Sequence, residues 1–352
     1  MIEIDVEKVR AETRGCSNLI HFNNAGASLM PAPVADYLCD FLREEEIKGG
    51  YETRSLRNAE VENFYTSVSR LLNAKPKEIA FVENATRAWD MVFYALPLGP
   101  GDKILTTVSE YGSNLIAYLH RAKQTGAEVV IVPNDNNGQI DVKALEQSID
   151  EKTKLISISH IPTGGGLVNP AHDVGRIAKK HGIPFLLDAC QSVGQMHLDV
   201  QEIGCDFLSA TGRKYLRGPR GTGFLYVQED WIERLEPPLL DQYAAELIDA
   251  NTYEIRTDAR RFENWERYFA GQAALGQAVD YAMELGLEAI ERRVVDLAAS
   301  LREGLQETGV LELTDQGAKK SGLVTFQHQR FDAEQVKMLV AKQNINVSTS
   351  RG

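Results

Sequence analysis

Residues 185–214 contain two apolar segments that each run into a polar turn. They read Phe185-Leu186-Leu187-Asp188-Ala189-Cys190-Gln191 and Cys205-Asp206-Phe207-Leu208-Ser209-Ala210-Thr211-Gly212-Arg213-Lys214. Short apolar runs bounded by turn residues are typical of buried strands. The first strand ends at the carboxylate Asp188, and the second leads to the amine of Lys214. These two groups are the starting point for both the fold and the chemistry.

The same alternation of strand and helix extends through the middle of the chain. Further strands are predicted over Glu78–Val82, Lys103–Val108, Glu128–Val132, Lys154–Ser159 and Gly223–Val227, with the two above at Ile183–Asp188 and Phe207–Ala210. Helices are predicted between them, at Ala85–Leu96, Ser113–Lys123 and Ala171–His181, and another from Asp141. This rhythm predicts an α/β fold with a large, mostly parallel sheet covered by helices.

The pattern changes near residue 262. Two helices (Trp265–Leu285 and Leu287–Glu307), two short strands (Leu311–Leu313 and Leu323–Gln327) and a helix (Ala333–Gln343) are predicted there. We therefore expect an N-terminal arm (1–25), a large domain (26–262) and a smaller α+β C-terminal domain (263–352). Because residues 345–352 resemble a strand entering a loop, we expect this last domain to be truncated.

Composition narrows the classes of function. The 352 residues are 43% hydrophobic and carry a formal net charge of −12, from 38 basic and 50 acidic residues. There is no basic cluster and no apolar run of membrane-spanning length, so neither nucleic acid nor a membrane is the expected partner. The four cysteines lack the spacing of a metal site, and the start lacks a signal peptide, which predicts reduced thiols in the cytoplasm.

Lys214 and Asp188 match the two main requirements of pyridoxal phosphate (PLP). This cofactor needs a lysine that holds its aldehyde as a Schiff base and a carboxylate that pairs with its pyridinium nitrogen. In isolation, Lys214 beside Arg213 would be a solvated surface pair, and Asp188 would cap the next helix. The glycine-rich run Gly218-Pro219-Arg220-Gly221-Thr222-Gly223 favours the ligand-binding interpretation, because glycine permits close approach to a ligand.

The other parts of a PLP site have candidates as well. Ala85 and Thr86 lie where a strand turns into a helix, and the free N–H groups of a helix start favour a phosphate. Thr211 and Arg213 add a hydroxyl and a charge. Gln191 is placed to bond the ring hydroxyl, and Tyr111 to cover the ring face. Each has an ordinary alternative, namely capping for Thr86, a helix-face position for Gln191 and packing for Tyr111.

Together these residues resemble the class V aminotransferase family of fold-type I PLP enzymes. That family includes cysteine desulfurases, selenocysteine lyases and isopenicillin N epimerase-like proteins. The resemblance runs from His21 to the end of the chain. It implies that Lys214 forms the Schiff base, that Asp188 and Gln191 bind the ring, and that Thr86 and Thr211 bind the phosphate. Desulfurases carry histidine at the positions of Tyr111 and Arg213 and often asparagine at the position of Thr163. The family also implies a homodimer.

Two departures guide the expected reaction. Cysteine desulfurases take up sulfur on a cysteine in a C-terminal loop, whereas the last cysteine here is Cys205. Gly49-Gly50-Tyr51 and Glu110-Tyr111-Gly112-Ser113-Asn114 also look similar to the lyase that cleaves hercynylcysteine sulfoxide. We therefore expect a C–S lyase that acts on an amino acid by β-elimination, without a persulfide cysteine.

Several alternatives stay open at this point. The same site would serve a transaminase or an epimerase. A protein of another class, a PLP-fold binding or regulatory module without catalysis, would retain the fold alone. An unrelated doubly wound nucleotide-binding enzyme is disfavoured, because no G-x-G-x-x-G follows the first strand and no Walker-type loop is present.

Overall fold

A seven-stranded sheet organises the protein, as predicted. The computed structural model describes residues 3–350. The strands lie in the order β2-β8-β7-β6-β5-β3-β4. Their bounds are Ile79–Val82 (β2), Lys103–Thr107 (β3), Glu128–Val132 (β4), Thr153–Ser159 (β5), Phe185–Asp188 (β6), Phe207–Thr211 (β7) and Gly223–Val227 (β8). Only β8 runs against its neighbours β2 and β7, and the other pairs are parallel. The prediction of a mostly parallel sheet is confirmed.

Both faces of this sheet are covered, because successive strand residues point to opposite sides. On β6, Phe185 and Leu187 belong to one hydrophobic core and Leu186 to another. The first core also takes residues of α4 (Asn58–Leu72), α8 (Ala171–His181) and α11 (Phe269–Leu285). The second takes residues of α5 (Ala85–Phe93) and α6 (Gly112–Thr125). Burial on both faces explains why the strands are continuous apolar runs rather than alternating ones.

The edge strand β2 is covered by a side chain instead of another strand. Glu263, which follows η3 (Ala259–Phe262), accepts a hydrogen bond of 2.8 Å from the backbone N–H of Phe81. The same buried carboxylate accepts a bond from the Tyr65 hydroxyl at 2.9 Å and pairs with Arg267 at 3.3 Å. These contacts fix β2, and β2 leads directly into the start of α5.

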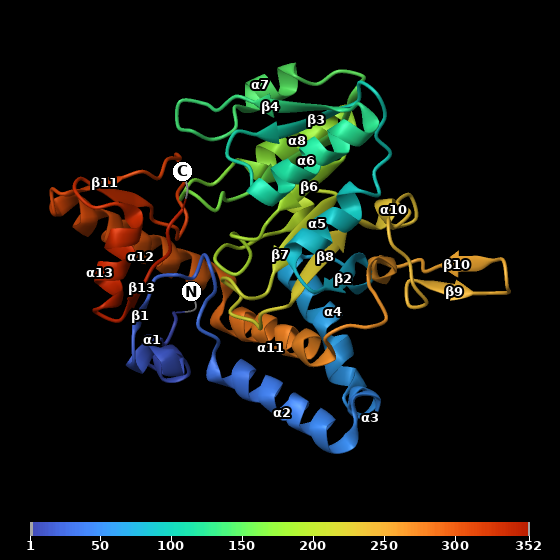
Figure 1. Cartoon of the computed structure of the whole chain (residues 1–352), viewed down its shortest axis with the longest axis horizontal. Helices are drawn as coiled ribbons and strands as arrows, with labels where there is room; N and C mark the ends of the chain where they lie inside the picture. Colours follow the sequence, from blue (N-terminus) through green and yellow to red (C-terminus); the bar gives the residue numbers. More distant parts are fainter. Residues whose placement is uncertain (1–2, 351–352) are drawn as a thin grey trace.

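The remaining elements surround this body (Figure 1). They are α1 (Val6–Ala11), η1 (Arg14–Ser17), β1 (Ile20–His21), α2 (Ala32–Lys48), α3 (Gly50–Leu56), η2 (Pro76–Glu78), α7 (Val142–Gln147), α9 (Val200–Ile203), α10 (Glu229–Ile232), β9 (Ala245–Leu247), β10 (Tyr253–Ile255), α12 (Leu287–Glu307), β11 (Leu311–Leu313), β12 (Phe326–His328), α13 (Ala333–Ala341) and β13 (Ile345–Asn346). The hairpin β9–β10 projects from the molecule, and α12 and α13 lie together at its opposite side. Within residues 3–350, no helix combines the length and apolar character needed to cross a membrane.

Three details differ from the sequence predictions. The helix predicted from Trp265 begins at Phe269, after a turn in which the Trp265 N–H bonds Asp241. The strand predicted over Leu323–Gln327 begins at Phe326. A boundary after residue 262 assigns α11 to the smaller domain, yet α11 packs on α4 and shares the core of the large sheet. The division into an arm and two domains otherwise stays a prediction.

Two segments near the ends of the chain pair with each other. β1 pairs in parallel with β13, so that Ile20 lies opposite Ile345 and His21 opposite Asn346. The segment after β1 then contacts the turn that holds Lys214: the Ser28 N–H bonds the Arg213 carbonyl at 2.9 Å, and Arg217 donates to the Leu29 carbonyl at 3.0 Å. This N-terminal segment therefore forms part of the surroundings of the candidate site.

Candidate active site

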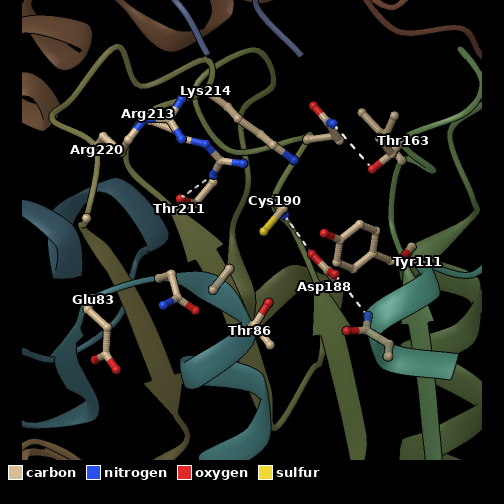
Figure 2. A pocket seen from close by; sticks show the side chains of 17 residues that line it. Glu83, Thr86, Tyr111, Thr163, Asp188, Cys190, Thr211, Arg213, Lys214 and Arg220 are labelled. Atoms are coloured by element: carbon tan, nitrogen blue, oxygen red, sulfur yellow. Dashed lines mark hydrogen bonds between the residues drawn. The ribbon is translucent and has the colours of Figure 1, made fainter. Parts of the chain in front are cut away.

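One cavity of about 260 Å³ lies at the carboxyl ends of β2, β5, β6 and β7 (Figure 2). Ligands in open α/β sheets bind at this edge. The cavity is lined by Glu83, Asn84, Ala85, Thr86, Tyr111, Asn114, Ser159, Ile161, Thr163, Asp188, Cys190, Gln191, Thr211, Arg213, Lys214, Arg220 and Gly221. All nine residues singled out from the sequence as binding or catalytic are among them. The structure therefore brings the set together, while the role of each toward a cofactor stays a prediction.

Lys214 lies in a tight turn after β7 and points into the cavity (Figure 2). The turn is closed by backbone bonds from Arg217 to the Lys214 carbonyl and from Gly218 to the Gly212 carbonyl. The Lys214 residue is 6% exposed, and in the described part of the chain no carboxylate forms an ion pair with it. Burial lowers the pKa of its ammonium group, and Arg213 lowers it further, whereas Cys190 and Asp188 oppose this effect. A buried amine of this kind is more readily neutral than a surface lysine.

Asp188 ends β6 on the opposite side of the cavity from Lys214. It is 7% exposed, and its carboxylate accepts two hydrogen bonds of 3.0 Å, from the Cys190 N–H and from the Asn114 side-chain amide. Cys190 belongs to a turn, so the alternative of a helix cap at Asp188 is wrong. Among the described residues no cation forms an ion pair with Asp188, and a buried carboxylate without such a partner is costly. A protonated ring nitrogen would supply that partner.

The start of α5, at the end of β2, is the candidate anion site. Asn84 caps the helix by accepting the Arg87 N–H at 2.8 Å, and Ala85 and Thr86 are its first residues. The first turn of a helix has N–H groups without helical partners and a partial positive charge. Arg213 donates to the Thr211 hydroxyl at 3.0 Å and brings a full positive charge to the same cavity. This combination suits a phosphate group.

Gln191 and Tyr111 define the rest of the wall. The Gln191 amide donates to the Ala25 carbonyl at 3.2 Å and to the Thr163 hydroxyl at 3.5 Å. Its Oε1 atom is buried and has no partner in the described chain. Because buried acceptors are rarely left unpaired, a ligand hydroxyl is the natural donor here. The Tyr111 ring is partly exposed and lies beside Asp188 (Figure 2).

Comparison with known proteins assigns the chain to a family. The family model described as aminotransferase class-V matches residues 20–352. The chain belongs to the aminotransferase class-V family. A probable cysteine desulfurase of Halalkalibacterium halodurans is 33% identical over 321 residues, which are 88% of this chain and 78% of that protein.

Solved structures agree with this assignment. Cysteine desulfurase from Thermococcus onnurineus, in its apo form, is 28% identical with a TM-score of 0.89, covering 98% of this chain and 87% of that one. The cystine C–S lyase C-DES, in complex with its product cysteine persulfide, is 21% identical with a TM-score of 0.89, covering 96% and 92%. The latter supports the fold alone. The predicted family and fold-type I architecture are confirmed, and the protein is an enzyme of the class-V family.

The sequence analysis missed several residues that line the cavity. Asn114 lies one helical turn after Tyr111, Ser159 ends β5, and Cys190 is two residues after Asp188. Strand-end positions are the signal by which Ser159 could have been found. Arg220 was noted only within a glycine-rich run, yet it lines the cavity and is exposed.

Substitution of Gly223 offers a test of the candidate anion site, because a side chain at this position would contact the backbone at the start of α5. A Cβ atom would lie 2.7 Å from the Ala210 carbonyl oxygen and 3.2 Å from the Ala85 nitrogen. We expect Gly223→Ala to weaken PLP binding about tenfold and to lower the free energy of unfolding by about 1–3 kcal/mol. PLP titration and urea unfolding measure the two effects. Gly304→Ala, where no atom lies within 4 Å, is the control: it should leave PLP affinity unchanged and, because Gly304 lies in helix α12, raise the free energy of unfolding by up to about 1 kcal/mol. Unaltered PLP affinity in Gly223→Ala would show that α5 does not hold the phosphate.

Proposed function

We propose that this protein is a PLP-dependent C–S lyase that releases sulfur from an amino acid by β-elimination, without storing it on a cysteine. The observation that carries the proposal is that Lys214 and Asp188 line one cavity together with the Cys190 thiol, whose pKa is raised. The residues fit the cofactor: the Gln191 acceptor without a partner in the described chain, the start of α5, and the Asp188 carboxylate, which forms no ion pair there, each match one part of PLP. Bound PLP supplies an aldehyde carbon that bonds the substrate amine and a ring that takes up electrons from Cα.

The chain's own residues then supply positioning and proton transfer. Lys214 would hold the cofactor aldehyde, and its Nζ atom would accept the proton of the substrate Cα. Its lowered pKa favours the neutral form that this step needs. Asp188 would hold the proton on the ring nitrogen. The phosphate would be held by Ala85, Thr86, Thr211 and Arg213, and the ring would be oriented by Gln191.

Sulfur chemistry is supported by the relatives and by Cys190. The relatives at about 30% identity are described as cysteine desulfurases, which favours a sulfur-containing amino acid as substrate. Among the described residues, Cys190 is the cysteine that lines the cavity. Burial, followed by the charge of Asp188, raises the pKa of the Cys190 thiol well above its usual range. Because the thiolate is the nucleophile, Cys190 is a poor sulfur acceptor.

A product screen tests the reaction. The PLP-loaded protein would be incubated with cysteine, cystine and cysteine S-conjugates or sulfoxides, and pyruvate, ammonia, the sulfur product and alanine would be measured separately. Cysteine plus water yields pyruvate, ammonia and sulfide in β-elimination. Alanine with a protein persulfide would instead assign a desulfurase. A second amino acid formed from a keto acid would assign a transaminase, and an inverted substrate without cleavage an epimerase. Absence of turnover with bound PLP would favour a non-catalytic module.

We also propose that the protein acts as a homodimer. Val108, which follows β3, and Ile116 and Leu119, one turn apart on α6, are exposed apolar residues in the chain segment around Tyr111. Apolar side chains grouped on a surface favour association. Light scattering coupled to size-exclusion chromatography measures the mass, and a monomer at micromolar concentration would contradict the proposal.

A further inference from the structure

Glu110 lies behind the wall of the cavity, and its carboxylate is held by many hydrogen bonds. It sits between β3 and α6, and its carboxylate accepts five hydrogen bonds from three elements. The donors are the Thr106 hydroxyl (3.0 Å), the Tyr111 N–H (2.7 Å), the Asn114 amide (3.1 Å) and both the N–H (3.1 Å) and the hydroxyl of Ser159. Glu110 therefore joins the ends of β3 and β5 to the first turn of α6.

Asn114 links Glu110 to Asp188. Its amide nitrogen is 3.1 Å from Glu110 Oε1 and 3.0 Å from Asp188 Oδ2. An amide nitrogen has two hydrogens, so it can donate one to each carboxylate at the same time. Asn114 is 2% exposed, which leaves its amide little freedom to turn elsewhere. The orientation of Asp188 is thereby tied to Glu110.

We propose that Glu110 is a positioning residue that acts through Asn114 to aim the Asp188 carboxylate at the cofactor ring nitrogen and to strengthen its hold on the ring proton. The reason is electrostatic as well as geometric. A second negative charge close to Asp188 stabilises a protonated, positively charged ring at short range. The inference rests on PLP as the cofactor, but not on the C–S lyase reaction.

The charged and titratable groups around Glu110 are few among the described residues. Asp188 on β6 and Tyr118 on α6 face it, and Lys214 and Cys190 lie beyond Asp188. Burial and the charge of Asp188 together raise the pKa of Glu110 to about 7, against the opposing effects of the Ser159 hydroxyl, the Tyr111 N–H and Asn114. Its negative charge should therefore grow as the pH rises through about 7. The proton affinity that Glu110 and Asp188 confer on the ring nitrogen should be highest above this pH.

Glu110→Gln removes this charge and keeps the size of the side chain. PLP labelled with ¹⁵N in the ring reports by NMR whether the ring nitrogen carries a proton, and the absorbance of the bound cofactor is followed over the same pH range. We expect the proton affinity of the ring nitrogen to fall about tenfold, and kcat to fall about tenfold with KM little changed. Glu110→Asp, which keeps the charge, should recover part of the effect.

Glu78→Gln is the matched control. Glu78 is a buried carboxylate that accepts backbone N–H groups of Lys75 and Glu229 at 2.8 and 2.9 Å, and it does not line the cavity. The Glu78→Gln variant should leave the ¹⁵N titration of the ring nitrogen unchanged. Should Glu110→Gln fail to fold, Asn114→Ala breaks the same link and should likewise shift the proton affinity of the ring nitrogen.

The outcomes are distinct. A wild-type protein that binds no PLP would overturn the proposed cofactor. A wild-type protein with a normal ring titration that Glu110→Gln or Asn114→Ala leaves unchanged would overturn only the role of Glu110. An equal shift in Glu78→Gln would also overturn it, because the effect would then be a general loss of structure.

Discussion

Lys214→Ala should lower turnover of a sulfur amino acid about a thousandfold or more, because it removes both the covalent attachment of the cofactor and the group that takes the Cα proton. The visible absorbance of the bound cofactor should change at the same time. Both readouts use purified protein supplied with excess PLP, with circular dichroism to confirm the fold. An added primary amine, which substitutes in part for the missing side chain, should restore a small fraction of turnover.

Lys48→Ala provides the comparison for this experiment. Lys48 ends α2 and forms an exposed ion pair of 2.6 Å with Glu44. Such surface pairs contribute little to stability, typically about 0–1 kcal/mol. Turnover and absorbance should therefore match the wild type. If Lys214→Ala kept its full activity, the assignment of Lys214 and the catalytic reading of the cavity would both be wrong.

Asp188→Asn should have the second largest effect, a fall in kcat of about a hundredfold or more with a smaller change in KM. The amide has nearly the same shape but no charge, so it no longer stabilises the proton on the ring nitrogen. The ring then accepts electrons from Cα less readily. Steady-state kinetics and ¹⁵N NMR of ring-labelled PLP measure the two consequences.

Asp206→Asn is a close match for this change at another strand. Asp206 precedes β7, and its carboxylate accepts the Phe185 N–H at 2.8 Å and the Trp231 indole N–H at 2.9 Å. It is absent from the cavity wall. We expect some loss of stability from this variant and normal kinetics from the folded fraction. Similar kinetic defects in both variants would contradict a specific role for Asp188.

Much of the sheet could be predicted because its strands are buried on both faces. Runs such as Phe185–Asp188 are short, apolar and bounded by turns, which distinguishes them from helices. The cavity followed from the same reasoning, since Asp188 and Thr211 end parallel strands and Ala85 begins the helix after β2. The order of strands and loops thus predicted which side chains meet.

The remaining features depend on contacts between distant segments. Asn114 and Asp188 are 74 residues apart, and Phe81 and Glu263 are 182 apart. Neither pair has a local signature. The packing of α11 on α4 was missed for a similar reason. Because α11 is rich in alanine and almost entirely apolar where it is buried, its sequence predicts a buried helix but does not indicate which element it packs against.

The parallel pairing of β1 with β13 sets an order of events during synthesis. The two strands are 325 residues apart, so they can pair only after nearly all of residues 3–350 have left the ribosome. Domains generally form as they emerge, and long loops close late. The large sheet would then be built first, and the β1–β13 pair, from which the chain continues into the segment beside the Lys214 turn, would form last. A nascent chain should consequently acquire its core before it acquires a finished cofactor site.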